Sequence, residues 1–389
     1  MEYVHLIYTE DLCMINFDNS ATSFPKPPVV KKAVIEAMTR YGGNPGRSGH
    51  NISLETAKAV YSARAAAADF FGAEPDNTVF AQNCTHALNM AIKGAASQGS
   101  HIIISSLEHN SVARPVHALS AQGKCTYSIA EVRPDDSETV ENFRRLITPQ
   151  TRMIVCTVGS NVTGQILPFE QIGRLCKEHN ICFIADGAQA CGVIPIKLSD
   201  GINILCTSGH KSLYGPSGTG LLVTDGKYNI EPIIEGGTGS ESLVLEQPEY
   251  LPDRLESGTV NTIGAIGLGT GINFVKKLGT NRIYEHENTL CRKFISAMRK
   301  LPRVTVYRDD RVKSYLPVVS FNIDGMTANE TAARLNEMGF ALRGGLHCSG
   351  LAHSSIGTIP DGTVRFSPSV FNTEKETSEL ILAVKKLAI

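Results

Sequence analysis

The order of local patterns in the first half of the chain is the feature that most restricts its fold. Ala-rich segments with helical spacing, at residues 27–40 and 54–71, are followed by short β-branched runs at residues 101–105, 153–157 and 181–185. Helix and strand units in alternation require a mostly parallel sheet with helices on its faces. The pattern therefore predicts an α/β fold.

Polar clusters follow the ends of the strand-like runs. They comprise residues 108–110, residues 159–161, Asp186 and residues 208–211. In open α/β sheets, ligands bind beyond the carboxyl ends of the strands. We therefore expect these four clusters to form one pocket.

Asp186 and Lys211 are the most informative pair in that pocket. Asp186 ends a strand-like run, and Lys211 follows the next apolar stretch. Together they suit pyridoxal phosphate, because an amine forms its Schiff base and a carboxylate keeps its pyridine nitrogen protonated. The ordinary alternatives are a helix cap for Asp186 and an exposed lysine beside the turn at residues 215–216 for Lys211.

A phosphate site is predicted on both sides of this pair. Cys84 and Thr85 stand at the start of a helical pattern, where backbone amides and the helix dipole favour an anion. Ser208 and His210 flank Lys211 and could donate to the same phosphate. The alternative for the first cluster is an ordinary N-cap.

Two further residues have candidate roles toward the ring. His109 could stack over the pyridine ring and help to move protons, and Gln189 offers an amide to the phenolic oxygen. A surface histidine is an equally simple interpretation of His109 alone.

Arg365 and Asn161 are the candidates for the substrate carboxylate. Arg365 lies in a short alternating run, residues 362–366, where a charge is costly to bury unless it is paired. A bidentate guanidinium–carboxylate contact supplies such a pair, and Asn161 could assist from the large domain. The alternative for Arg365 is a structural salt bridge.

Cys348 stands apart from the other cysteines because glycines, a serine and histidines surround it. These surroundings suit a reactive thiolate that attacks a sulfur atom. Metal binding by His347, Cys348 and His353 is the competing hypothesis, although further ligands at regular spacing are missing.

Composition restricts the partners and the compartment. The net charge is −1 and basic residues are spread along the chain, so we expect a small-molecule substrate and neither nucleic acid nor membrane as a partner. The ten cysteines include no CxxC pair, which indicates reduced thiols in the cytoplasm. No apolar stretch reaches the ~18 residues of a membrane span, and the start lacks a signal peptide. Residues 1–13 precede the organised sequence and are expected to be dispensable.

The 389 residues exceed the ~100–200 of a usual domain. Because the pattern changes after residues 258–261, we expect a large domain at residues 27–260 and a smaller α+β domain at residues 261–389. Residues 1–26 are expected to pack with the small domain.

These motifs together resemble the class V aminotransferase superfamily of pyridoxal-phosphate enzymes, fold type I, and in particular its cysteine desulfurase and selenocysteine lyase branch. The resemblance spans nearly the whole chain through residues 17–25, 83–86, 108–109, 160–161, 185–189, 208–211, 258–259, 343–348 and Arg365. It implies a large domain with a mostly parallel seven-stranded sheet, and a small C-terminal domain that carries the catalytic cysteine loop. It also implies a homodimer.

The resemblance implies a role for each matching residue. The cofactor contacts are Cys84, Thr85, His109, Asp186, Gln189, Ser208, His210, Lys211 and Thr259, of which Thr259 would reach the phosphate of the partner subunit. The substrate contacts are Asn161, Arg343 and Arg365. The catalytic residues are Lys211, His109 and Cys348, and Cys348 would take sulfur from L-cysteine as a persulfide, release L-alanine and pass the sulfur to an acceptor protein.

Departures from the family pattern leave other activities open. A histidine familiar from one desulfurase group is Leu346 here, and Cys84 replaces a usual threonine. L-selenocysteine is the alternative substrate. The rival functions are an aminotransferase or lyase of the same superfamily in which Cys348 is incidental, and a cofactor-free scaffold or sulfur-carrier-binding module.

Overall fold

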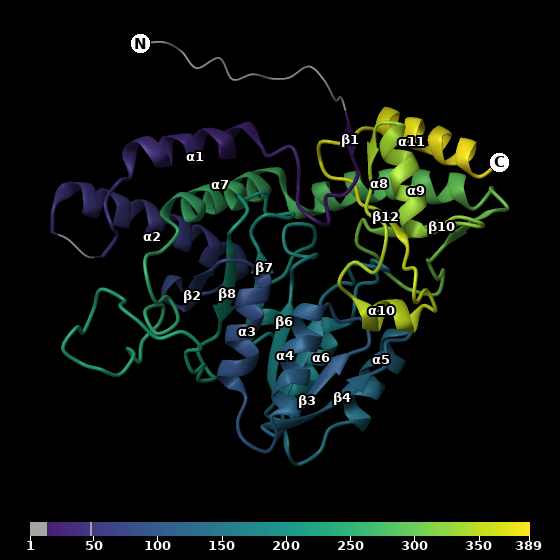
Figure 1. Ribbon diagram of the computed structural model, residues 1–389. Coiled ribbons are helices and arrows are strands. Elements are labelled where there is room, and N and C mark those ends of the chain that lie inside the picture. The colour runs from purple at the N-terminus through teal and green to yellow at the C-terminus, as the bar shows by residue number, and fades with distance from the viewer. Residues whose placement is uncertain (1–13, 47–48) are drawn as a thin grey trace, which may run out of the picture.

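The computed structural model describes residues 14–46 and 49–389, so the prediction about residues 1–13 lies outside the described residues. A seven-stranded sheet in the order β2-β8-β7-β6-β5-β3-β4 forms its centre (Figure 1). β8 runs antiparallel to β2 and β7, and the other neighbouring strands are parallel. The strands are β2 (Thr78–Ala81), β3 (Ser100–Ser105), β4 (Cys125–Ala130), β5 (Thr151–Thr157), β6 (Cys182–Asp186), β7 (Ile204–Ser208) and β8 (Gly220–Thr224). The predicted mostly parallel α/β fold is confirmed.

Helices cover both faces of this sheet because successive strand residues point to opposite sides. On β3, Ile103 belongs to one hydrophobic cluster with residues of α2, α5, α6 and α7, whereas Ile102 and Ile104 belong to a second cluster with residues of α3 and α4. These helices are α1 (Pro28–Arg40), α2 (Asn51–Phe71), α3 (Cys84–Ala95), α4 (Asn110–Ala121), α5 (Asp136–Arg145), α6 (Phe169–Glu178) and α7 (Thr262–Leu278), with the 3₁₀ turns η1 (Pro75–Asn77) and η2 (Leu198–Asp200). Both faces of the central strands are therefore buried.

Local sequence explains where the helices next to the sheet edge begin. The side chain of Asn83 accepts a hydrogen bond from the His86 amide and caps α3, and His109 caps α4 in the same way through Ser111. Both caps follow strand ends, because Asn83 comes after β2 and His109 comes after β3. The amino ends of α3 and α4 consequently face the carboxyl edge of the sheet.

A second, smaller unit has its own hydrophobic core. Phe294, Phe321 and Phe366 meet in this core, with ring centroids 4.5 Å apart for Phe294 and Phe366. An antiparallel sheet in the order β12-β10-β9 and a two-stranded β1-β11 sheet build it. Its elements are β1 (Ile15–Asn16), α8 (Thr280–Met298), β9 (Val304–Val306), β10 (Val319–Ile323), α9 (Ala328–Glu337), β11 (Phe340–Ala341), α10 (Gly350–Ser355), β12 (Val364–Phe366) and α11 (Glu374–Leu387).

The N-terminal segment joins this smaller unit, since β1 pairs in parallel with β11 and Phe17 lies in the same core. Helix α7 instead packs on α1 and α2 (Figure 1), and its Leu268 and Ile272 belong to the core of the large sheet. The domain limits at residues 26 and 260 stay proposals. Within the described ranges, none of the helices is long and apolar enough to cross a membrane.

Candidate active site

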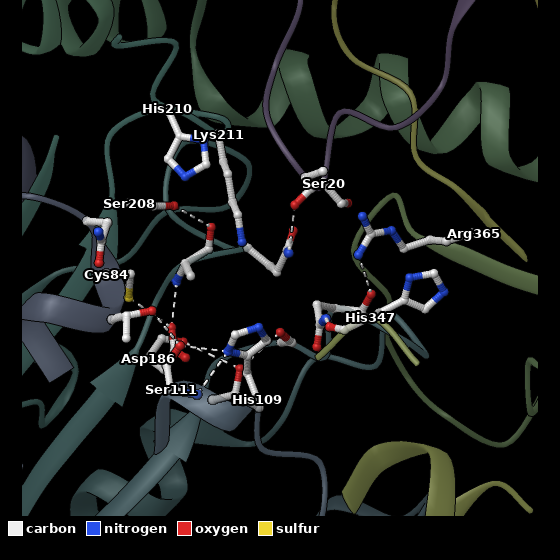
Figure 2. A pocket seen from close by; sticks show the side chains of 18 of the residues that line it. Ser20, Cys84, His109, Ser111, Asp186, Ser208, His210, Lys211, His347 and Arg365 are labelled. Atoms are coloured by element: carbon white, nitrogen blue, oxygen red, sulfur yellow. Dashed lines mark hydrogen bonds between the residues drawn. The ribbon is translucent and has the colours of Figure 1, made fainter. Parts of the chain in front are cut away.

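A cavity of about 340 Å³ opens at the carboxyl ends of β3, β5, β6 and β7 (Figure 2). The four polar clusters predicted from the sequence all contribute to it. Its lining residues are Ser20, Ala21, Asn83, Cys84, Thr85, His109, Ser111, Thr157, Gly159, Asn161, Asp186, Ala188, Gln189, Ser208, His210, Lys211, Arg343, His347 and Arg365. Two predicted residues, Cys348 and Thr259, are not part of this lining.

Lys211 and Asp186 share the cavity. Figure 2 shows the Lys211 side chain extended into its centre. Asp186 is buried at the end of β6, and its Oδ1 accepts hydrogen bonds from the Ala188 amide at 2.9 Å and from Cys84 Sγ at 3.4 Å. Burial lowers the pKa of Lys211, and the negative charge of Asp186 opposes that shift. The cavity therefore holds an amine that loses its proton more readily than an exposed lysine.

Hydroxyl groups and a helix start gather at the side of the cavity formed by α3. Thr85 Oγ1 lies 2.8 Å from Ser111 Oγ, next to the amino end of α3. Ser208 donates to the Ala188 carbonyl at 3.4 Å, a weak contact that leaves the hydroxyl adaptable. His210 Nδ1 is buried and has no hydrogen-bond partner among the described residues. This set of donors suits an oxyanion such as phosphate.

His109 is held by its own helix cap. Its Nδ1 accepts the Ser111 amide at 3.0 Å and lies 2.6 Å from Ser111 Oγ. Burial lowers the pKa of His109 to about 4, against the opposing effect of Asp186. The imidazole is therefore neutral at pH 7 with its proton on Nε2, because Nδ1 acts as the acceptor.

Gln189 contacts the N-terminal segment. Its Nε2 donates to the Ser20 carbonyl at 3.1 Å, and both residues line the cavity. This hydrogen bond fixes the Gln189 amide at the cavity wall beside Ser20.

Arg365 enters the cavity from β12 and is almost fully buried. Its Nη2 lies 2.7 Å from Asp18 Oδ1, and its Nη1 donates to the Asn161 carbonyl at 3.2 Å. Its Nε is buried without a partner among the described residues. Arg365 thus forms the structural salt bridge that was the alternative for it, with Asp18. Its Nε–H remains free to donate a further hydrogen bond.

Asn161 links the two units across the cavity. Its Nδ2 donates to the His347 carbonyl at 2.9 Å, and its Oδ1 accepts from Ser349 Oγ at 2.7 Å. Both contacts lie in the loop that carries Cys348. Asn161 therefore positions that loop against the large sheet.

Cys348 is exposed and belongs to the segment between β11 and α10. Its sulfur lies 3.7 Å from Arg343 Nη2, and its carbonyl accepts the amide of Asn110 at 2.8 Å. The backbone φ of Cys348 is 58°, in the left-handed region that residues other than glycine rarely adopt. Because Arg343 lines the cavity, its contact with Cys348 places the thiol next to the cavity.

The described cysteines carry no disulfide. Eight of them are buried, and Cys348 is the exposed one. His347 is buried, and burial lowers its pKa to about 2, so its imidazole is neutral. Its Nε2 lies 2.9 Å from the Thr363 carbonyl and its ring centroid lies 5.5 Å from that of His353. Across residues 14–46 and 49–389, no group of three or more His, Cys, Asp or Glu side chains is arranged to hold a metal ion.

Sequence reasoning did not assign roles to several lining residues. Ser20 lies in the N-terminal motif at residues 17–25, which carried part of the family resemblance, and so does Asp18, which does not line the cavity but contacts Arg365. Ser111 and Thr157 were missed because a hydroxyl has no pattern of its own, although each lies within two residues of a predicted strand-end cluster. Their positions next to those clusters could have predicted that they line the cavity.

The residues present fit pyridoxal phosphate. Asp186 offers a carboxylate, and Lys211 offers an amine whose pKa is lowered. The partnerless Nδ1 of His210 and the hydroxyls beside the amino end of α3 provide a separate set of donors for a phosphate group. This combination of one amine, one carboxylate and a phosphate cradle matches what that cofactor requires.

Comparisons with known proteins agree with this geometry. The family model described as Aminotransferase class-V matches residues 15–380. A "Probable cysteine desulfurase" of Methanothermobacter thermautotrophicus is 28% identical over 384 residues, which cover 95% of this chain and 94% of that protein. A "Cysteine desulfurase" of Klebsiella pneumoniae is 30% identical over 380 residues, which cover 95% of this chain and 92% of that protein.

Solved structures have the same fold. The apo structure of a cysteine desulfurase from Thermococcus onnurineus NA1 has a TM-score of 0.89 and 28% identity, and the match covers 96% of this chain and 94% of that one. The cysteine desulfurase CsdA from Escherichia coli, in an S-sulfonic acid form, has a TM-score of 0.84 and 25% identity, with coverage of 96% and 94%. The chain therefore belongs to the aminotransferase class-V family, in the group that includes the cysteine desulfurases.

Proposed function

We propose that this chain is a pyridoxal-phosphate-dependent cysteine desulfurase, which converts L-cysteine to L-alanine and takes the sulfur onto Cys348. The observation that carries the proposal is an exposed thiol next to the cavity that holds Lys211 and Asp186. Cys348 touches Arg343, which lines that cavity. The names of the relatives at 28–30% identity over nearly the whole chain support the same activity.

The residues of the large sheet would hold the cofactor. Lys211 would bind it covalently, Asp186 would contact the ring nitrogen, Gln189 the ring oxygen, and His109 would stack on the ring. Thr85, Ser208 and His210 would bind the phosphate, with Cys84 beside Asp186. When bound, pyridoxal phosphate supplies an electron sink for negative charge at the substrate Cα. Thr259 is exposed, and its contact with the partner subunit's phosphate stays a prediction.

Arg365 and Asn161 would bind the substrate carboxylate. The partnerless Nε of Arg365 gives a charged donor, and a carboxylate is the acceptor that satisfies a buried guanidinium best. Arg343 is exposed, and its Nη2 lies 3.7 Å from the sulfur of Cys348. The substrate would thus lie with its carboxylate at Arg365 and its side chain toward Cys348.

The chain's own residues would move protons and sulfur. Lys211, with its lowered pKa, takes the Cα proton. The Cys348 thiolate then attacks the substrate sulfur, so that a new S–S bond forms and the Cβ–S bond breaks. The electron pair of the broken Cβ–S bond stays with carbon, Cβ gains a proton, and Lys211 returns a proton to Cα as alanine forms. An acceptor thiol removes the terminal sulfur and returns Cys348 to its thiol state.

The finer partners are part of the same proposal. A homodimer is favoured by exposed apolar side chains on α1 and on the segment before α7, among them Met38, Leu243 and Leu245. Figure 1 shows that this segment projects from the large unit. A cytoplasmic location is favoured by the free buried thiols. The acceptor protein is expected to approach Cys348 from the solvent side.

The deciding experiment measures alanine release from L-cysteine by wild type and by the Cys348→Ala variant, with and without a reductant. We expect turnover to be lost in Cys348→Ala and kept in Cys125→Ala, a cysteine on the edge strand β4. Turnover that survives in Cys348→Ala would instead identify an aminotransferase or lyase of the same family. Turnover of L-selenocysteine alone would identify a selenocysteine lyase.

A further inference from the structure

The segment at residues 18–26, here called the strap, contacts the cavity at two places. One contact is with Arg365, and the other is with the turn that carries His210 and Lys211. In Figure 2 it descends to Ser20, between Lys211 and Arg365. The segment follows β1, which is fixed to the smaller unit by pairing with β11.

Asp18 is at the Arg365 end of the strap. Its Oδ1 lies 2.7 Å from Arg365 Nη2, and its amide is fixed by Asn16 Oδ1 at 3.0 Å. The Arg365 side chain is 2% exposed and that of Asp18 is 24% exposed. Arg365 has no other carboxylate partner in the described part of the chain, so Asp18 determines which guanidinium edge faces the cavity.

Lys26 is at the Lys211 end of the strap. Its Nζ donates to the His210 carbonyl at 2.7 Å and to Ser23 Oγ at 2.8 Å. Ser23 adds its own amide to the His210 carbonyl at 3.1 Å and its hydroxyl to the Lys211 carbonyl at 2.9 Å. Strap residues therefore donate to the carbonyl groups of His210 and Lys211 in the turn that carries Lys211.

Lys26 is also an unusual amine. No carboxylate of the described residues forms an ion pair with it, and burial lowers its pKa to about 8. Burying an ammonium without an acid partner costs free energy, which its hydrogen bonds to the His210 carbonyl and to Ser23 offset in part. Its neighbour His210 feels its charge, because the pKa of His210 is lowered by burial first and by Lys211 and Lys26 next.

We infer that Asp18 and Lys26 are positioning residues: Asp18 orients Arg365 for the substrate carboxylate, and Lys26 fixes the His210–Lys211 turn for the cofactor. The inference rests on the proposed function, because it assigns Arg365 and Lys211 the roles given there. It makes the strap a single element that sets the geometry between these two groups. Neither residue touches the reacting atoms.

The Asp18 half is tested with Asp18→Asn, which keeps the shape and removes the charge. We expect the KM for L-cysteine to rise about 10-fold or more, as for loss of one charge-assisted hydrogen bond, with kcat changed less than about threefold. The matched control is Asp310→Asn, because Asp310 forms a 2.7 Å ion pair with Arg299 away from the cavity. An unchanged KM in Asp18→Asn, or an equal rise in Asp310→Asn, would overturn this half.

The Lys26 half is tested without turnover, by titrating the apo enzyme with pyridoxal phosphate and following the visible absorbance of the bound cofactor. We expect Lys26→Met to raise the cofactor Kd by about tenfold, Lys26→Arg to restore most of it, and Lys31→Met on the exposed side of α1 to change nothing. An unaltered Kd in Lys26→Met would refute the role. An inactive wild type that still shows these Kd changes would reject the desulfurase function and keep the role of Lys26.

Discussion

Glu108 allows a test of how burial changes the pKa of a carboxyl group in this protein. Its side chain is fully buried at the end of β3, next to His109. Its Oε1 accepts hydrogen bonds from the Thr157 amide at 2.8 Å and from Ser105 Oγ, while its Oε2 has no partner among the described residues. Burial raises the pKa of Glu108 from 4.5 to about 8, and the charge of Asp186 adds to the rise.

The stability effect follows from linkage. The folded protein keeps the proton on Glu108 up to about pH 8, whereas the unfolded chain loses it near pH 4.5. The contribution of this group to stability is present below pH 4.5 and is lost as the pH rises through 8. At about 1.4 kcal/mol per pH unit, the full loss is about 5 kcal/mol.

The perturbation is Glu108→Gln, which is neutral at every pH and keeps an oxygen for the Thr157 amide. We expect the variant to gain stability relative to wild type by about 1.4 kcal/mol for each pH unit between pH 5 and 7. Denaturant midpoints at several pH values measure this. A protonated-carboxyl infrared band present at pH 6 in wild type and weaker in Glu108→Gln measures the proton directly.

Two results would refute the reasoning on Glu108. Parallel stability curves for wild type and variant would mean that Glu108 ionises normally in the folded protein. An unchanged infrared band would assign the proton to another acid. Glu287 serves as the internal standard, because burial raises its pKa to about 8 as well and Glu287→Gln should remove its own share of the band.

Two further predictions concern buried ionisable groups away from the reacting atoms. Burial lowers the pKa of His353 to about 4, so its contribution to stability is present above about pH 6.5 and is lost as the pH falls toward 4. The variant His353→Asn should therefore reduce the slope of the stability curve on its acid side by up to about 1.4 kcal/mol per pH unit. The control variant His179→Asn, at an exposed position, should leave this slope unchanged. Arg64 forms a buried ion pair with Glu256 at 2.6 Å, so Arg64→Met should cost about 3–5 kcal/mol in urea denaturation. The exposed Arg40→Met should cost less than about 1 kcal/mol, and equal losses in the two variants would contradict the burial argument.

Much of the fold and the site could be predicted from local patterns. The strands β3, β5 and β6 were visible as β-branched runs, and their ends predicted the positions of His109 and Asp186 in one cavity. This works because parallel strands place all their carboxyl ends on one edge of the sheet. Helix α7 follows the proposed boundary at residue 260 in sequence and packs on α1 and α2. A helical pattern shows that an apolar face exists, and it does not show what covers that face.

The contacts of the strap were beyond prediction. Asp18 and Arg365 are separated by 347 positions in the chain, and no periodicity connects them. Cys348 and Arg343 are only five positions apart, but their contact and the exposure of Cys348 depend on a loop with a left-handed backbone. The pair of Asp18 and Arg365 forms only when folding brings the segment after β1 next to β12 within the smaller unit.

The sequence by itself determined the element types and the set of chemical groups, because helix and strand periods, caps and strand-end polar residues act over a few neighbouring positions. Only the tertiary structure decided which ionisable groups are neutral and which donors are left unfilled. Burial in a low-dielectric interior shifts the pKa values of Lys211, His109 and Glu108, and that burial exists only once the sheet, the smaller unit and the N-terminal segment enclose the cavity.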